Sequence, residues 1–125
     1  MSFEAVDYAY KRVRQQDGRE WKLWFNESLE GLQFRLLTKD DAGGCYESVT
    51  GLAAPSTNLD AIIREDDNDD AYFTDMFHYA SAKGSIEICL EIKTRELAWV
   101  NATGEYAASD CSLGLSAPLM PEIAG

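Results

Sequence analysis

The stretch Ile86-Glu87-Ile88-Cys89-Leu90-Glu91-Ile92-Lys93 carries the clearest structural signal in this chain. Its isoleucines and leucine fall on alternate positions, and the residues between them are charged apart from Cys89. Because successive side chains of a β-strand point to opposite faces, this period of two predicts a half-buried strand. We expect Ile88 and Leu90 to lie at the centre of the core.

Other alternating segments predict partners for this strand. Residues 21–26 and 32–37 alternate in the same way, and the short connection between them contains a glycine, which is typical of a β-hairpin. Residues 94–96 form a turn into a strand at 97–102, so a second hairpin is expected. Residues 45–52 form either a third strand or an irregular edge.

Helical spacing is found in other parts of the chain. Residues 3–15 place apolar side chains on one helical face, with acidic residues early and basic residues late, as the helix dipole favours. Residues 71–80 have a similar apolar spacing and are followed by a glycine stop signal. Ser56 or Thr57 is a candidate cap for a short helix that reaches Arg64.

Together these elements predict an α+β fold in a single domain that spans residues 1–125. Two hairpins form an antiparallel sheet, two helices pack on one face of that sheet, and residues 109–125 form an irregular C-terminal tail. A chain of 125 residues suits one domain rather than two, and a hydrophobic content of 46% is sufficient for a core.

The chain is strongly acidic, and its charge is unevenly distributed. The formal net charge is -11 at pH 7. Residues 1–39 hold seven basic and six acidic side chains, whereas residues 40–125 hold four basic and sixteen acidic ones. This charge repels phosphate backbones, so it disfavours direct nucleic-acid binding through a broad basic face and favours basic protein partners.

The densest acidic segment is Glu65-Asp66-Asp67-Asn68-Asp69-Asp70, called the acidic run below. Asp66, Asn68 and Asp70 match the first, third and fifth positions of a calcium-binding EF-hand loop. The sixth position is Ala71 instead of glycine, and the twelfth is Phe77 instead of glutamate. We therefore predict no metal site and interpret the run as a solvated loop or an interaction surface.

The three cysteines, Cys45, Cys89 and Cys111, are odd in number and show no CxxC spacing. This pattern predicts reduced thiols that pack as small apolar residues, and hence a cytoplasmic protein. We expect no secretory signal at the amino end and no membrane-spanning segment. Cys45 follows two glycines, but its acidic neighbours disfavour a reactive thiolate, so we interpret it as structural.

Candidates for catalysis are few. His78 is the only histidine, and no phosphate-binding loop, metalloprotease, nucleophile-elbow or kinase motif is present. A histidine within an apolar helical segment is expected to be structural, so we predict no catalytic residue and no cofactor. The alternative is a small-ligand-binding module or small enzyme with a pocket between the sheet and the helices near His78, lined by Tyr79 and Cys45.

These features favour a small acidic inhibitor that binds a basic surface of a partner protein, such as a nuclease or a toxin, because clustered carboxylates imitate phosphates. In size and charge the chain is similar to toxin immunity proteins and to phage anti-defence (anti-CRISPR-like) proteins, a resemblance that transfers no site residue.

Trp21 and Trp24 are three residues apart, so one is expected in the core and the other on the surface, where it can anchor a partner. The predicted partner-binding residues are Glu65, Asp66, Asp67, Asp69, Asp70, Asp75, Asp40, Asp41, Trp24 and Tyr72. A third hypothesis is an oligomerising subunit, for example a homodimer, that pairs through exposed strand edges.

Overall fold

The chain folds into an antiparallel β-barrel. The computed structural model describes residues 8–55, 62–64, 71–91, 95–107 and 111–121. The strands are β1 (Tyr10–Gln16), β2 (Arg19–Ser28), β3 (Gly31–Asp40), β4 (Tyr46–Pro55), β5 (Ile62–Arg64), β6 (Ala71–Ser81), β7 (Gly84–Glu91), β8 (Ala98–Ala102) and β9 (Leu115–Pro121). A 3-10 helix, η2 (Gly104–Ala107), is the helical element within these residues.

Eight of the nine strands follow one another around the barrel. Their neighbour order is β4-β3-β2-β1-β9-β8-β7-β6, and a pairing between β4 and β6 closes the cycle. The remaining strand, β5, pairs with β6 and lies outside this cycle. Closure pairs the strand edges that an open sheet leaves exposed. The closing pairs cover only two residues each of β1 and β4, so the oligomer hypothesis stays a prediction.

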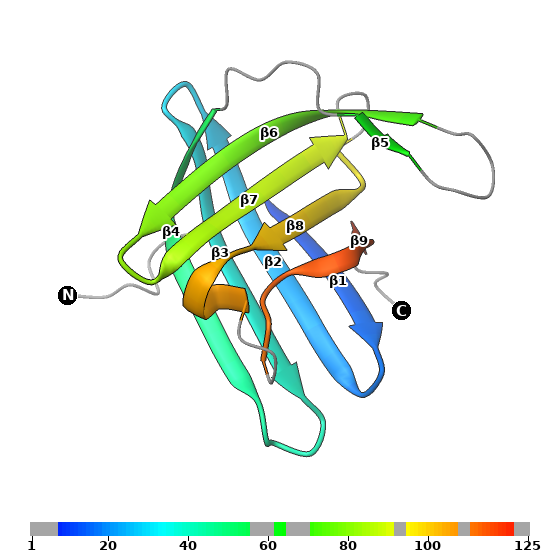
Figure 1. Cartoon of the computed structure of the whole chain (residues 1–125). Helices are drawn as coiled ribbons and strands as arrows, with labels where there is room; N and C mark the ends of the chain where they lie inside the picture. The colour runs from blue at the N-terminus through cyan, green and yellow to red at the C-terminus, as the bar shows by residue number, and fades with distance from the viewer. Residues whose placement is uncertain (1–7, 56–61, 65–70, 92–94, 108–110, 122–125) are drawn as a thin grey trace.

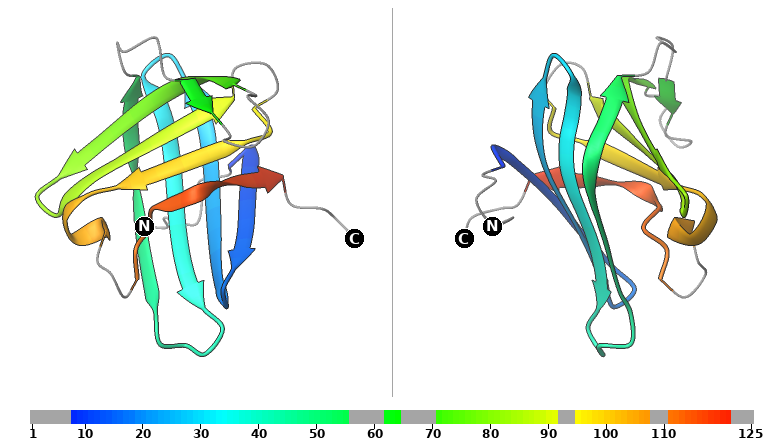
Figure 2. Two further views of the ribbon diagram at one scale, coloured as in Figure 1. Left: turned by 45° about the vertical axis from the view of Figure 1, so that its right-hand side comes forward. Right: turned by 90° about the vertical axis from the view of Figure 1, so that its left-hand side faces the viewer.

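The barrel is flattened into two layers (Figures 1 and 2). Strands β1 to β4 form the first layer, and β6 to β9 cross it to form the second. Within the first layer, β2 and β3 pair along their whole length, from Arg19↔Asp40 to Ser28↔Gly31. The closing pairs β1–β9 and β4–β6 each align only two residue pairs. The layers are therefore joined along narrow seams and held together chiefly by the side chains between them.

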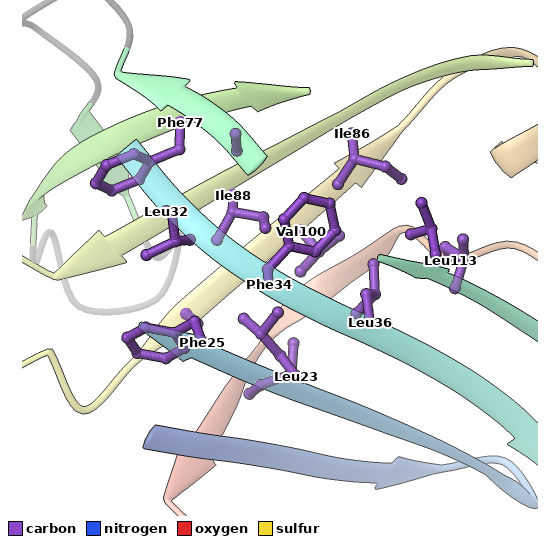
Figure 3. Close-up of a cluster of buried hydrophobic side chains, with 14 of the residues drawn as sticks. Leu23, Phe25, Leu32, Phe34, Leu36, Phe77, Ile86, Ile88, Val100 and Leu113 are labelled. Atoms are coloured by element: carbon purple, nitrogen blue, oxygen red, sulfur yellow. The ribbon is translucent and has the colours of Figure 1, made fainter. Parts of the chain in front are cut away.

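Alternate side chains from both layers fill the barrel interior (Figure 3). Phe34 of the first layer belongs to the same buried cluster as Ile88 and Val100 of the second. An eight-stranded barrel is just wide enough for side chains to fill. The expected core positions of Ile88 and Leu90 are confirmed. The largest fully buried apolar side chains are Phe25, Phe34, Leu23, Leu32, Leu36, Ile86, Ile88, Leu90, Leu113, Leu119 and Val100.

The predicted hairpins are confirmed, and so is the third strand. Residues 21–26 and 32–37 lie in β2 and β3. Residues 86–91 of the stretch from Ile86 lie in β7, whose hairpin partner is β8, and Ile92 and Lys93 lie outside the described residues. Residues 45–52 fall almost entirely in β4. Trp21 is buried and Trp24 is on the outer face, as their spacing predicted.

The α+β prediction is wrong, because the segments with helical spacing form strands. Residues 71–80 lie in β6, where Phe77 aligns with Ile88 of β7 and with Pro55 of β4. Adjacent apolar residues such as Met76 and Phe77 fit one face of a helix as well as they fit a strand. Pairing with strands distant in the sequence decides between the two, which a local pattern does not contain.

The other predictions for helical or irregular segments are also wrong where the structure describes these segments, because the residues pair as strands with other segments of the chain. Residues 10–15 of the helix expected over 3–15 lie in β1, and residues 3–7 lie outside the described residues. The inward side of β1 carries arginines, so this strand lacks the apolar alternation of a typical strand. Residues 62–64 of the expected short helix form β5, and the rest of that helix lies outside the described residues. The supposedly irregular C-terminal tail contains β9, which completes the barrel between β8 and β1.

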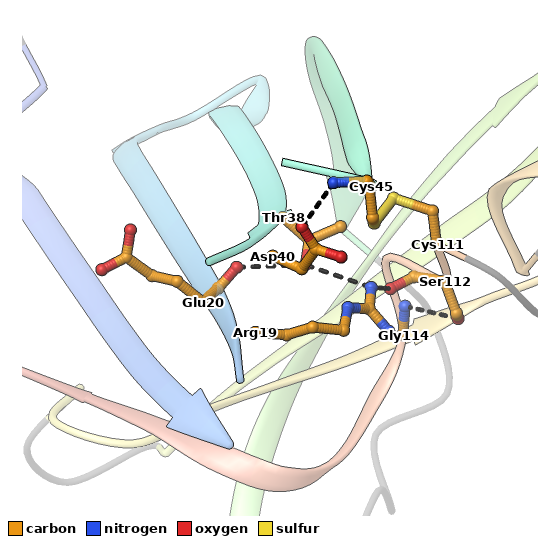
Figure 4. The surroundings of a disulfide bond; sticks show 9 residues. Arg19, Glu20, Thr38, Asp40, Cys45, Cys111, Ser112 and Gly114 are labelled. Carbon is orange, nitrogen blue, oxygen red and sulfur yellow. Dashed lines mark hydrogen bonds between the residues drawn. A yellow bond between two sulfur atoms is a disulfide. The ribbon is translucent and has the colours of Figure 1, made fainter. Parts of the chain in front are cut away.

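The prediction of three reduced thiols is also wrong in this structure. Cys45 and Cys111 form a disulfide, with their Cα atoms 5.5 Å apart, between the β3–β4 connection and the segment before β9 (Figure 4). The sequence separation of 66 residues hides this proximity. Cys89 is the free cysteine and is buried. Burial raises the pKa of the Cys89 thiol, although a hydrogen bond with Thr74 acts in the opposite direction.

Candidate functional site

The acidic run connects two paired strands. The run itself, from Glu65 to Asp70, lies outside the described residues. The residues that flank it, Arg64 and Ala71, are aligned with each other across β5 and β6, and Tyr72 is aligned with Ile63. The five carboxylates of the run are therefore covalently attached to adjacent ends of one β-hairpin.

This hairpin projects from the barrel wall. β6 is long enough to pair with β7 along the wall and with β5 beyond it. In Figure 1, β5 is at the upper edge of the molecule, beside the end of β6 that carries Ala71. β5 takes no part in closing the barrel, so the paired residues that flank the acidic run lie beyond the closed cycle of strands.

Asp75 belongs to an ion-pair cluster. Arg95 Nη1 lies 2.7 Å from Asp75 Oδ2, while Arg95 Nε and Nη2 donate hydrogen bonds to the Glu27 carboxylate at 3.0 and 3.1 Å. Burial lowers the pKa of Arg95, but its hydrogen bonds with Asp75 and Glu27 outweigh this effect and hold the pKa above the usual value. Arg95 therefore links β6 to β2, and Asp75 is less available to a partner than its sequence position implied.

The backbone of Arg95 is held as well. Its carbonyl oxygen accepts hydrogen bonds from Arg12 Nε at 2.9 Å and Arg12 Nη2 at 2.6 Å. Desolvation lowers the pKa of the Arg12 guanidinium, and the charges of Glu96 and Tyr10 oppose this effect. This cluster links β1, β2, β6 and the β7–β8 connection. Sequence reasoning missed it because its members come from four separate segments.

Asp40 and Asp41 are at the opposite end of the barrel. Asp40 Oδ1 accepts a hydrogen bond from the backbone nitrogen of Gly44 at 2.7 Å, and the backbone nitrogen of Asp41 donates to the carbonyl of Gly18 at 2.9 Å. These bonds organise two neighbouring turns. Figure 1 shows the β3–β4 connection at the lower end of the barrel and β5 at the upper end. The predicted acidic residues therefore do not form one continuous surface.

Trp24 lies on the outer face of the first layer, away from the β5–β6 hairpin. Its neighbours in register are Lys11 on β1 and Arg35 on β3. Lys11 Nζ lies 5.5 Å from the centre of the Trp24 ring, and the Arg35 guanidinium carbon lies 5.3 Å from it. Cations at these distances are attracted to the electron-rich face of an indole. Trp24 and the two cations therefore form a row across three strands.

Further cations surround this row. Lys22 Nζ and Lys39 Nζ lie 3.4 and 3.9 Å from Glu20 Oε1 on the same face. The outward residues of β1, β2 and β3 thus include four cations and one carboxylate, although the whole chain is acidic. We call this surface the cation–tryptophan face; it consists of Lys11, Lys22, Trp24, Arg35 and Lys39. The excess of basic residues before residue 40 is the feature of the sequence that indicates this face. Because residues 3–15 were expected to form a helix, the alignment of β1 with β2 could not be predicted.

A shallow groove adjoins the cation–tryptophan face. Its volume is about 270 Å³. Thr50, one of its lining residues, is aligned with Arg35, and Leu52 is aligned with Gln33 in the next row. The side chain of Leu52 is nearly half exposed at 46%. The lining residues are Ser28, Glu30, Gln33, Thr50, Gly51 and Leu52.

The alternative ligand site near His78 is not assembled. His78 is exposed, whereas the next residue, Tyr79, points inward and packs edge-on against Phe34 with ring centres 5.4 Å apart. Burial raises the pKa of Tyr79, and Tyr106 adds to the shift through its charge and a hydrogen bond. Cys45 is in the disulfide. Within the described ranges, no group of three His, Cys, Asp or Glu side chains is arranged to hold a metal ion.

Comparison with known proteins gives no family. Protein-family models, curated proteins and solved structures all return no match. The described part of the chain contains no helix long and apolar enough to cross a membrane.

Proposed function

We propose that this protein is a non-catalytic inhibitor that docks the hairpin carrying the acidic run on a basic, nucleic-acid-binding surface of a partner protein. The observation that carries the proposal is the position of β5, which lies outside the closed cycle of eight strands. The strands flanking the run are paired, so its carboxylates are attached to an ordered support. Ordering the support before binding reduces the entropy that association costs.

The charge of the molecule suits such a partner. A net charge of -11 attracts a basic protein over a long distance and raises the rate of encounter. Nucleases and nucleic-acid-directed toxins present basic grooves, because these grooves must hold phosphates. The run supplies clustered negative charge of the same sign as a phosphate backbone.

Binding to purified basic nucleases tests this proposal, with the protein encoded by the neighbouring gene included. We expect at least one nuclease to bind and to lose cleavage activity. Its association rate should fall at least tenfold between 0.1 and 1 M salt, because the Debye length shrinks from about 10 Å to about 3 Å. Biolayer interferometry measures the rate, and a cleavage assay measures the inhibition.

Two variants with the same change in net charge locate the contact. In the test variant, Asp66, Asp67, Asp69 and Asp70 are replaced by asparagine. In the control variant, Asp17→Asn is combined with Glu87→Gln, Glu96→Gln and Glu105→Gln. We expect the test variant to associate much more slowly than the control. Equal rates for the two variants would show that the run is not the docking element, and cleavage of nucleic acid by the chain itself would contradict the non-catalytic assignment.

The expected cytoplasmic location forms part of this proposal, and the redox state of the cysteines tests it. Disulfides persist in oxidising compartments and are rare in the cytosol. Alkylation of intact cells before lysis, followed by mass spectrometry, reports Cys45 and Cys111 in place. Free thiols at both positions would support the cytoplasm, and a disulfide in the cells would contradict it.

A further inference from the structure

We infer that the cation–tryptophan face, together with the adjoining groove, is a second docking surface that binds an acidic segment of a partner protein. It is on the outer face of the first layer, whereas the hairpin that carries the acidic run extends from the second (Figure 2). The two surfaces are therefore separate, and this inference does not depend on the proposed function.

The arrangement of the cations carries the inference. The Trp24 ring has Lys11 on one neighbouring strand and Arg35 on the other, at 5.5 and 5.3 Å. Contact with the ring restrains both cations close together on an open sheet face. Arginine binds carboxylates with two parallel hydrogen bonds, and tryptophan and arginine dominate the energetics of protein interfaces. A carboxylate above this row would interact with two cations at once.

The groove adds an apolar contact beside the charged row. Residues two apart on a strand are separated by about 7 Å, so Leu52 lies roughly that far along the strand from the row of Thr50 and Arg35. An extended peptide that places a carboxylate over Arg35 can therefore place an aliphatic side chain against Leu52. Gln33 and Thr50 supply polar side chains along the same groove. This combination fits a peptide with one aliphatic residue followed by acidic ones.

Three observations favour an acidic protein segment over a nucleic acid. The two cations are within about 5.5 Å of the Trp24 ring, so they compete with a base for its faces. Glu20 between Lys22 and Lys39, and Glu30 in the groove, would repel a continuous phosphate backbone. The net charge of -11 repels a long polyanion more strongly than a short segment with few charges.

The test is an NMR titration of the full chain with three probes. The probes are a synthetic peptide with one leucine followed by four acidic residues, an otherwise identical peptide with four lysines, and oligothymidine. We expect the acidic peptide to shift the Trp24 indole signal and the amides of Lys39 and Leu52. The tryptophan signal is identified with Trp24→Phe. The lysine peptide should leave this face unchanged, since any contact it makes belongs to the acidic run.

A matched pair of single substitutions completes the test. Arg35→Gln removes a cation from the face, and Lys83→Gln removes an exposed one from the β6–β7 turn. We expect the first to weaken binding of the acidic peptide about threefold to tenfold and the second to leave it unchanged. Equal affinities for the two variants, shifts confined to other surfaces, or no shifts at millimolar peptide would overturn the inference. Tighter binding of oligothymidine than of the acidic peptide would identify the face as a nucleic-acid site. Shifts of the same signals with protein concentration alone would identify it as a self-association site. Either result would also overturn the inference.

Discussion

Individual inward-facing residues determine how completely the barrel interior is filled. Ile88 is fully buried and is aligned with Phe77 on β6 and Val100 on β8. Its side chain lies between the layers, in the cluster that also contains Phe34 (Figure 3). Interiors packed in this way adjust only partly when atoms are removed, so a truncation leaves a cavity.

The substitution Ile88→Ala should therefore lower the free energy of unfolding by about 2 to 5 kcal/mol. Ser48→Ala, at an exposed position on β4, should change it by less than about 0.5 kcal/mol. Urea denaturation followed by tryptophan fluorescence measures both values. A loss below about 1 kcal/mol for Ile88→Ala would show that the assigned direction of the β7 side chains is wrong.

At the scale of elements, the disulfide and Arg19 join the two layers at one end of the barrel (Figure 4). Arg19 Nη2 donates hydrogen bonds to Thr38 Oγ1 at 3.1 Å and to the carbonyl of Ser112 at 2.6 Å. The Arg19 guanidinium carbon also lies 4.4 Å from the centre of the Trp21 ring. The segment before β9 is thus attached to Arg19 of β2 by a hydrogen bond and to the β3–β4 connection by the Cys45–Cys111 bond.

The double variant Cys45→Ser/Cys111→Ser should be less stable than the wild type by about 2 to 4 kcal/mol, because the bond restricts the unfolded chain. A reductant should destabilise the wild type by a similar amount and should leave the double variant unchanged. Thermal melts with and without dithiothreitol measure both effects. If the wild type is insensitive to reductant and intact mass shows three free thiols, the disulfide does not form in solution.

At the scale of the whole molecule, strand pairing is most extensive between β2 and β3, and it is least extensive where the layers close and between β8 and β9. β2 and β3 are paired along ten residues each, whereas the β1–β9 and β4–β6 seams align two residue pairs each. Local opening breaks the fewest hydrogen bonds at the seams. The Arg95 cluster and the disulfide both cross between segments near the ends of the barrel, where they limit this opening.

The rates of amide hydrogen exchange should differ between the seams and the centre of the first layer. We expect Met120 and His78 at the seams to exchange at least tenfold faster than Leu23 and Leu36 in the centre of the first layer, because opening a seam exposes fewer paired groups. Exchange measured by NMR in the native state gives the individual rates. Uniform protection across seams and layer centres would mean that the barrel opens only by global unfolding.

The sequence by itself determined the strands whose inward side is continuously apolar. The stretch from Ile86 and the hairpin with Trp21 and Leu32 show a period of two, and residues 86–91, 21–26 and 32–37 all lie in strands of the barrel. The opposite directions of Trp21 and Trp24 follow from the same period. Burial of one face is a local property of a strand, so it leaves a pattern that a single segment reveals.

Only the tertiary structure decided the barrel, the disulfide and the arrangement of the two surfaces. β1 carries Arg12 inward because the carbonyl of Arg95, distant in the sequence, accepts its hydrogen bonds. β6 is a strand because β7 and β4 pair with it, although its own spacing also fits a helix. The row across Trp24 exists because β1 and β3 are its neighbours in register. Each of these features depends on contacts between separate segments, and no pattern within one segment encodes such contacts.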